Sequence, residues 1–304
     1  MQKKILLTGL KWMLATEFLE KFSDKYKIFW FDSKEMDITK SEEIEKKIFV
    51  IQPDLVLNLA AYTNVDDAED VWEEINLAVN SDWVENLAKI CWKNNIDFIT
   101  ISTDFVFDWA KEDWYDENDV QNPINEYWFA KMLWEKNARD FCENSIIIRT
   151  SWLYWGWKKF KNFVNTMLNL WEKIEKFEKW EEWWIKELKI ISDQFWNPTY
   201  CWDLCDWIWK VIDNIEKYRW KNFHFSNEVW EKISWFDFAE EIFLQSRKKN
   251  KKNIWEKFWN LKKINASEYR RKAKTPKFSI LNNNSEIKIW DWKGGLEKYL
   301  KKIV

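Results

Sequence analysis

The stretch Lys4-Ile5-Leu6-Leu7-Thr8-Gly9-Leu10-Lys11-Trp12-Met13-Leu14-Ala15 decides the fold of this chain. An apolar run ends in a glycine-containing turn, and an amphipathic pattern begins directly after the turn. This order predicts a strand, a tight loop and a helix whose N-terminus can support an anion. If position 12 is read as glycine, the loop has the Gly-x-x-Gly-x-x-Ala spacing of a dinucleotide-binding loop. If Trp12 is read literally, its indole would fill the place of the phosphate.

Tryptophan and glycine occur in unusual proportions. The 304 residues include 27 Trp and 4 Gly, whereas a typical chain carries roughly 7% Gly. Trp stands where turns, helix caps and phosphate loops need glycine, as in Asp108-Trp109, Tyr127-Trp128 and Tyr154-Trp155-Gly156-Trp157. We therefore interpret most Trp as glycines of the native protein, which would follow if UGA codons that encode Gly were translated as Trp. The basic residues, of which only six in 48 are Arg, agree with an AT-rich genome.

The alternative is a genuinely Trp-rich chain. Random enrichment in Trp would not select turn positions, so we prefer the glycine interpretation for most of them. Three tryptophans lie in apolar or aromatic contexts and are expected to be genuine: Trp152, Trp235 and Trp292.

Composition and charge exclude several classes of protein. The net charge is −3 and the Lys and acidic residues are interspersed, which argues against a nucleic-acid-binding surface. No stretch approaches the ~20 consecutive apolar residues of a membrane span, and the short N-terminal apolar run reads as a strand and not as a signal peptide. We therefore expect no nucleic-acid partner, no membrane partner and a cytoplasmic location.

Cysteine and histidine give no sign of a metal site or a nucleophilic triad. The four cysteines, Cys91, Cys142, Cys201 and Cys205, lack disulfide or zinc spacing and are expected to be small buried hydrophobes. His224 is the one histidine of the sequence and lies in an alternating, strand-like run. It is expected to be a structural residue.

Short apolar runs alternate with amphipathic stretches in the first half of the chain. The expected strands are Lys4–Thr8, Lys27–Phe31, Leu55–Asn58, Phe98–Ser102 and Ile146–Arg149. The expected helices between them are Leu14–Phe22, Ser41–Val50, Trp72–Asn94 and Tyr127–Cys142. This alternation predicts an α/β fold with a Rossmann-type, doubly wound parallel sheet.

The second half is more mixed. Its expected helices are Phe160–Trp171, Leu204–Lys217, Trp235–Ser246 and Gly294–Lys301. The charged region 172–189 is expected to be a solvated hairpin or loop, and the Lys cluster at 247–252 a solvated helix end. We predict a dinucleotide-binding domain at 1–150 and a smaller α/β, mainly substrate-binding domain at 151–304, with segments around 190–215 returning to the first domain.

Tyr127 and Lys131 are four residues apart and therefore share one face of a helix. A nearby ammonium favours the phenolate and lowers the tyrosine pKa, so that Tyr127 can deliver a proton to a developing alkoxide. Thr103 ends the preceding strand, where its hydroxyl can hold a substrate carbonyl oxygen. The Tyr-x-x-x-Lys pattern is weak alone, but it becomes specific together with the loop and this hydroxyl.

Asp32 ends the second expected strand, about where an acidic residue grips the adenosine ribose. An aspartate there weakly favours NAD over NADP. The alternative is a solvated carboxylate that belongs to the turn.

Taken together, these segments resemble the dTDP-4-dehydrorhamnose reductase family of extended short-chain dehydrogenases/reductases over nearly the full chain. With Trp read as Gly, Tyr127–Glu135 comes very close to the family pattern. The segments that carry the resemblance are Asn58–Asp66, Ser102–Trp109, Asn122–Glu135, Arg149–Tyr154, Asn162-Phe163-Val164, Asp193–Thr199 and Ser234–Ala239.

The resemblance implies reduction of the 4-keto group of dTDP-4-dehydro-L-rhamnose by NADPH or NADH, which gives dTDP-L-rhamnose, a nucleotide sugar for cell-wall polysaccharide. Tyr127 would be the acid, Lys131 its tuner and ribose anchor, and Thr103 the carbonyl orienter. The implied cofactor contacts are Gly9, Lys11, Trp12, Met13, Leu14, Asp32, Asp37, Ile38, Ala60, Ala61, Tyr62, Tyr127 and Lys131. The implied substrate contacts are Thr103, Asp104 and Trp152.

The chain departs from the family at two places. Lys274-Thr275-Pro276-Lys277-Phe278-Ser279 stands where the family often has Arg-Arg-Pro-x-x-Ser, so that one diphosphate-binding cation is lost unless Lys277 replaces it. The third loop position is Ala15 instead of glycine.

Two alternative functions stay open: a non-catalytic relative that binds cofactor and regulates a partner enzyme, and a different nucleotide-sugar reductase or epimerase. A homodimer also stays open, as does a Mg²⁺ requirement, which no residue pattern supports.

Overall fold

The computed structural model describes most of the chain. The described residues are 2–10, 12–32, 34–60, 83–108, 110–124, 126–156, 160–177, 187–249, 261–269, 277–287 and 290–303, and within them the side chains of 126–127, 174–177 and 249 are left out.

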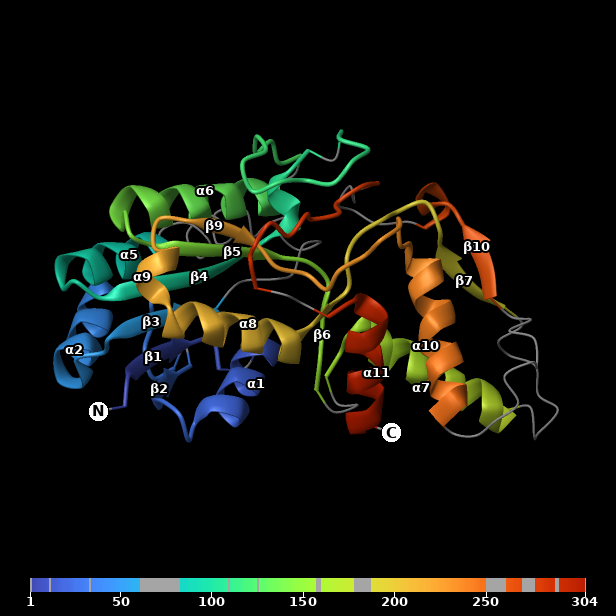
Figure 1. Ribbon diagram of the computed structural model, residues 1–304, viewed down its shortest axis with the longest axis horizontal. Helices are drawn as coiled ribbons and strands as arrows, with labels where there is room; N and C mark the ends of the chain where they lie inside the picture. Colours follow the sequence, from blue (N-terminus) through green and yellow to red (C-terminus); the bar gives the residue numbers. More distant parts are fainter. Residues whose placement is uncertain are drawn as a thin grey trace.

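A six-stranded parallel sheet forms the larger layer of the molecule (Figure 1). The strand order is β2-β1-β3-β4-β5-β9. The strands are β1 (Lys4–Thr8), β2 (Lys27–Phe31), β3 (Leu55–Asn58), β4 (Asp97–Thr103), β5 (Ile146–Thr150) and β9 (Asn222–His224). The predicted α/β fold with a parallel sheet is therefore confirmed, and β9 extends it beyond the five expected strands.

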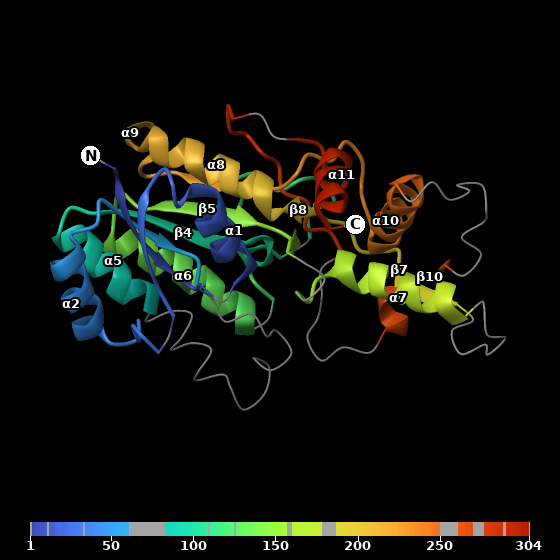
Figure 2. The ribbon, with the colours of Figure 1, turned by 90° about the horizontal axis from the view of Figure 1, so that it is seen from below.

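Helices cover both faces of this sheet, which explains why its central strands are continuously apolar. Successive side chains of a strand point to opposite faces. Accordingly, Ile5 and Leu7 pack into one apolar cluster, and Leu6 packs into another. On the first face lie α1 (Met13–Phe22) and α8 (Cys201–Asp213), and on the second lie α2 (Ser41–Ile51), α5 (Trp83–Lys93) and α6 (Glu126–Phe141) (Figure 2).

A smaller layer is built largely from the second half of the chain. Helix α10 packs against α7, α11 and the edge of β7. Its helices are α7 (Phe163–Phe177), α10 (Trp235–Lys249) and α11 (Trp292–Ile303), and its strands form the parallel pairs β6 (Leu153–Tyr154) with β8 (Thr199–Tyr200) and β7 (Leu188–Ile191) with β10 (Leu261–Ile264). The short elements are α9 (Ile215–Tyr218), η2 (Asp104–Val106) and η3 (Ala266–Glu268).

Two expectations for the second half are wrong. Helix α7 continues to Phe177, into the charged region expected to be a hairpin or loop, because Lys and Glu are good helix formers. The single helix expected at 204–217 is two helices, since Asn214 takes a non-helical φ of −125° between α8 and α9.

The backbone at three tryptophans bears on the glycine interpretation. Trp220 has φ +66°, in the left-handed region that favours glycine, and so supports that interpretation. Trp12 has φ −85°, which any residue adopts, so its backbone gives no such support. Trp152, expected to be genuine, nevertheless has φ +43°. The glycine interpretation stays a prediction that sequence evidence from the native protein must test.

Candidate functional site

The loops after β1 and β3 meet at the carboxyl edge of the sheet, where the strand order reverses. Gly9 has φ +79°, and a Cβ atom added to it would lie 2.6 Å from the backbone nitrogen of Ala60. Only glycine therefore allows this approach. Open α/β sheets bind their ligands at such a switch point, and the structure brings Gly9 and Ala60 together there.

The N-terminus of α1 opens directly from the same loop. Trp12 occupies the N-cap position without a side-chain capping bond, and its backbone N–H donates to the Gly9 carbonyl at 2.9 Å. The backbone N–H groups of the first turn are thus left for an anion. Met13 is partly buried, and the side chain of Leu14 packs in the core, so that Leu14 can meet a ligand only through its backbone.

Two carboxylates that follow β2 are expected to contact the cofactor, and both accept hydrogen bonds from the turns in which they lie. Asp32 Oδ1 accepts from the backbone of Lys34 at 2.8 Å. Asp37 Oδ1 accepts from the Thr39 hydroxyl at 2.7 Å, and this bond is the main cause that lowers the pKa of Asp37. Ile38 is buried. Three other expected cofactor residues, Lys11, Ala61 and Tyr62, lie outside the described residues.

Thr103 and Asp104 lie at the end of β4. The Thr103 hydroxyl donates to Asp104 Oδ1 at 2.9 Å and accepts from the Phe105 backbone at 3.3 Å. Asp104 is 1% exposed, and burial raises its pKa to about 7. Its Oδ2 atom has no hydrogen-bond partner among the described residues. This carboxyl group can therefore both donate and accept a hydrogen bond near neutral pH.

Helix α6 carries the expected acid and its tuner along β4 and η2. Tyr127 lies in the first turn of α6, and its side chain is outside the described part of the structure. Lys131 is 2% exposed, and its Nζ donates to the Ile101 carbonyl at 3.3 Å. Burial lowers the pKa of Lys131 to about 7, and the charge of Glu135 opposes this shift. Lys131 is therefore bound to the strand that ends in Thr103.

Trp152 joins the sheet to the smaller layer. Its ring centroid lies 6.0 Å from that of Phe105 after β4, 4.9 Å from that of Trp196 and 3.8 Å from that of Trp235 on α10. Phe105, the chain neighbour of Asp104, is thus in ring contact with Trp152.

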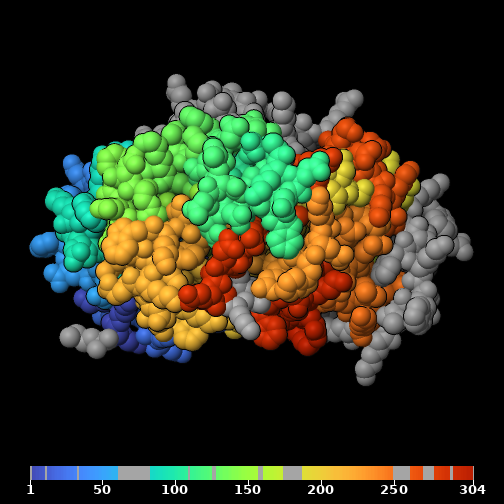
Figure 3. Space-filling model, turned by 45° about the horizontal axis from the view of Figure 1, so that its top comes forward, coloured from blue at the N-terminus to red at the C-terminus, as the bar shows by residue number. Residues whose placement is uncertain are grey.

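The C-terminal segment 277–287 crosses between the two layers (Figure 3). The Ser279 N–H donates to the Phe195 carbonyl at 2.9 Å, and the Tyr115 N–H donates to the Ile280 carbonyl at 2.8 Å. Lys277, a candidate diphosphate-binding cation, is exposed at the start of this segment.

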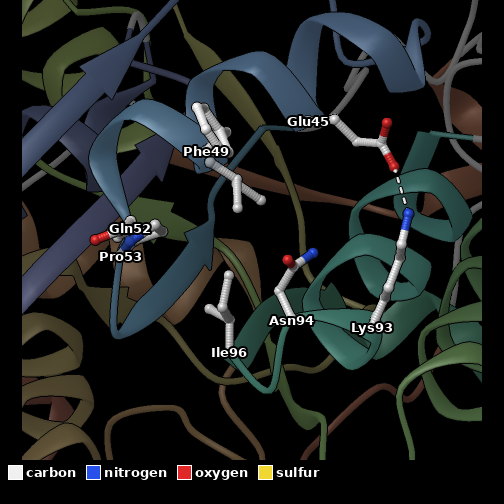
Figure 4. A pocket seen from close by; sticks show the side chains of 8 residues that line it. Glu45, Phe49, Gln52, Pro53, Lys93, Asn94 and Ile96 are labelled. Atoms are coloured by element: carbon white, nitrogen blue, oxygen red, sulfur yellow. Dashed lines mark hydrogen bonds and ion pairs between the residues drawn. The ribbon is translucent and has the colours of Figure 1, made fainter.

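Two surface hollows lie away from this edge. One, of about 490 Å³, is lined by Gln52, Pro53, Asn94 and Ile96, which precede β3 and β4, and its wall carries the Glu45–Lys93 ion pair (Figure 4). It opens at the amino ends of these strands, opposite the switch point. The other, of about 470 Å³, lies against α10 and the start of α11.

The structure confirms the structural interpretation of His224. Its Nδ1 atom lies 3.0 Å from the Tyr115 carbonyl and 3.1 Å from the Asn282 carbonyl, and burial lowers its pKa to about 3. The four cysteines are free and buried, as expected.

Two negative findings concern the described residues alone. No group of three His, Cys, Asp or Glu side chains among them could hold a metal ion. No helix in this part of the chain is both long and apolar enough to cross a bilayer.

A buried ion pair beside Lys131 is not among the site residues predicted from the sequence. Arg149 on β5 donates from Nε to Glu135 Oε1 at 2.9 Å and from Nη2 to Glu135 Oε2 at 2.7 Å. The side chains of Arg149 and Glu135 are 3% and 4% exposed. The sequence carried a signal for this pair, because an arginine that directly follows the apolar run Ile146-Ile147-Ile148 in a strand needs a buried partner.

Known proteins match the chain over most of its length. Residues 3–304 match the family described as RmlD substrate binding domain. A dTDP-4-dehydrorhamnose reductase of Aggregatibacter actinomycetemcomitans is 30% identical over 92% of this chain and 90% of its own. The spore coat polysaccharide biosynthesis protein SpsK of Bacillus subtilis is 28% identical over 98% of this chain and 97% of its own.

Solved structures agree with this match. The dTDP-4-dehydrorhamnose reductase of Bacillus anthracis, in complex with NADP, has a TM-score of 0.85 and 29% identity, and the match covers 99% of this chain and 100% of that one. A Clostridium acetobutylicum dTDP-4-dehydrorhamnose reductase has a TM-score of 0.83 and 30% identity, with 98% and 99% covered. The chain therefore belongs to the dTDP-4-dehydrorhamnose reductase family, whose RmlD substrate binding domain spans nearly all of it.

Proposed function

We propose that this protein reduces the 4-keto group of dTDP-4-dehydro-L-rhamnose to give dTDP-L-rhamnose, with NADPH or NADH as the reductant. One observation carries the proposal: Lys131 on α6 bonds to the Ile101 carbonyl of β4, the strand that ends in Thr103 at the same carboxyl edge of the sheet as Gly9. Relatives named for this reaction, one of them in complex with NADP, support both the substrate and the cofactor.

The backbone at the switch point fits a dinucleotide. The close approach of Gly9 to Ala60 leaves no room for a side chain, and the uncapped N-terminus of α1 presents N–H groups to a pyrophosphate. When bound, the reduced nicotinamide supplies the hydride for the carbonyl carbon. The Trp12 indole departs from the family at this loop.

Side chains at the carboxyl edge of the sheet have separate roles toward the 4-keto oxygen of the substrate. Thr103 holds this oxygen through its hydroxyl, and Tyr127 supplies the proton that converts it to an alcohol. Lys131, in its ammonium form, lowers the pKa of Tyr127 and anchors the nicotinamide ribose. Asp104, a buried carboxyl group that can donate and accept, and Trp152 contact the sugar nucleotide.

Tyr127→Phe tests the chemistry. We expect turnover of the 4-keto sugar nucleotide, followed by NADH or NADPH absorbance, to fall by roughly 10²–10⁴-fold, the usual contribution of general acid catalysis. The Kd for the cofactor should stay close to that of the unmodified protein. Unchanged turnover would overturn the assigned mechanism.

The same assay separates the alternatives. A regulatory relative would bind cofactor without turnover, and an epimerase would convert the sugar without net consumption of NADH. A cytoplasmic location, where both substrates are dissolved, is part of the proposal. A homodimer stays a prediction that light scattering can test.

A further inference from the structure

We propose that Glu135 and Arg149 are positioning residues for the reaction: their buried pair fixes α6 against β5, and the Glu135 carboxylate keeps the Lys131 ammonium charged. The inference rests on the proposed roles of Tyr127 and Lys131. The partners of Arg149 in the structure are Glu135, Glu117 and His224.

The geometry of the pair is specific. Three hydrogen bonds join the Arg149 guanidinium to Glu135, at 2.7, 2.9 and 3.1 Å. The remaining Nη1 group of Arg149 donates to the Glu117 carbonyl at 3.0 Å and to His224 Nε2 at 3.2 Å. Gln121 also donates to the Glu135 carboxylate. A guanidinium that donates from all three of its nitrogens in this way is held in one orientation.

Two short connections link this pair to Lys131 and Thr103. Glu135 lies one helical turn after Lys131 on α6, so that both side chains share a face. On the sheet, Arg149 is paired in register with Ser102 and the next residue, Thr150, with Thr103. A shift of α6 relative to β5 would therefore displace Lys131 from the strand that carries Thr103.

Among the described residues, Glu135 is the counter-charge of Lys131. On β4, the ammonium donates to the backbone carbonyl of Ile101, which is uncharged. On α5, Glu85 is paired with Lys89 at the surface, and from β9 the neutral His224 adds no charge. After β4, Asp104 has its own pKa raised by burial. The Glu135 charge favours the ammonium against the cost of burial.

A buried ion pair is by itself weak evidence for a contribution to stability. A role in holding the charge of Lys131 predicts an effect that a purely structural role would not produce. Without the carboxylate, the ammonium loses its counter-charge and its pKa falls, so that the protein loses the active protonation state at lower pH.

The test is the pH profile of kcat for Glu135→Gln, with Asp140→Asn as the matched control. Asp140 is an exposed acid of the same helix, paired with Lys136. We expect the alkaline limb to move to lower pH by about one unit or more in the Gln variant and to stay in place in the control. Glu135→Asp, which keeps the charge, should keep the limb while lowering kcat.

Removing one partner of a buried pair can prevent folding, so the double variant Glu135→Gln/Arg149→Gln is measured in parallel. It leaves no uncompensated guanidinium and should shift the alkaline limb in the same direction. The proposal would be overturned if kcat fell equally at every pH and the alkaline limb did not move. Either of the two variants, the single or the double, can show this as long as it folds. If Lys131→Met leaves turnover and the profile unchanged, the proposed chemistry itself is wrong, which is a distinct outcome.

Discussion

Nη1 of Arg149 on β5 lies 3.2 Å from Nε2 of His224, its buried partner in register on β9. The other ring nitrogen, Nδ1, faces the carbonyls of Tyr115 and Asn282 and must donate to them. Nε2 then accepts from Arg149, so that the imidazole is neutral. Burial is the main cause that lowers the pKa of His224 to about 3, and the charge of Arg149 is the second cause.

We predict that His224 shows no protonation step near the ordinary histidine pKa of 6.5. Because its folded-state pKa lies below the unfolded value, its contribution to stability is present above pH 6.5 and is lost as pH falls toward 3. NMR of the ring protons checks this directly, since the chain has one histidine. A midpoint near 6.5 in the folded protein would contradict the hydrogen-bond assignment.

A second buried charge links the first helix to the last. Glu17 on α1 is 0% exposed, and its Oε1 atom lies 3.2 Å from Nζ of Lys302 on α11. Burial outweighs this lysine and raises the pKa of Glu17 from 4.5 to about 7. The folded state therefore holds the Glu17 proton more tightly, and the resulting stabilisation, complete below pH 4.5, is lost as pH rises through 7.

Glu17→Gln should remove this loss. We expect the variant to exceed the unmodified protein in free energy of unfolding by up to about 3 kcal/mol well above pH 7, with a much smaller difference in mild acid. Urea denaturation at the two pH values measures it, and Glu20→Gln, an exposed position on the same helix, is the control. A pH-independent difference would mean that Glu17 is ionised in the folded protein throughout.

Gly9→Ala tests the contact between the β1 and β3 loops. The added Cβ would meet the Ala60 backbone at 2.6 Å with φ at +79°, so we expect a loss of about 1–3 kcal/mol in stability and weaker cofactor binding. Gly294→Ala is the matched control, because the added Cβ atom would lie 3.4 Å from Asp291, an ordinary contact distance. Gly294 lies in helix α11, where alanine should raise the free energy of unfolding by about 1 kcal/mol at most. Equal cofactor Kd values for the two variants would argue against the assigned loop.

The mass of native peptides that cover positions 12, 128 and 134 tests the glycine interpretation. Glycine there would restore the phosphate loop and make the Trp chain a translation artefact. Tryptophan would leave a blocked loop and favour the non-catalytic alternative. In the Trp chain, Trp220→Gly should stabilise the fold by about 1 kcal/mol because it relieves a left-handed φ of +66°.

The parallel sheet could be predicted because its strands are local apolar runs bounded by turns. Lys4–Thr8, Lys27–Phe31 and Leu55–Asn58 have the expected bounds. The pairing of Leu188–Ile191 with Leu261–Ile264 could not be predicted, since short strands far apart in sequence carry no signal of their partner. The positions of Thr103 and Lys131 follow from strand and helix order.

The Arg149–Glu135–His224 network depends on tertiary contacts between three elements. Spacing along the chain does not encode it, so only the isolated arginine in an apolar strand hinted that a buried partner exists.

The crossing of segment 277–287 between the layers has a consequence for how the protein is made. Ser279 and Ile280 bond to Phe195 and Tyr115, and Lys302 reaches back to Glu17. While residues 277–302 are still inside the ribosomal tunnel, the nascent chain lacks the strap that ties its two layers together. The two layers can therefore be joined in this way only after Lys302 has left the tunnel.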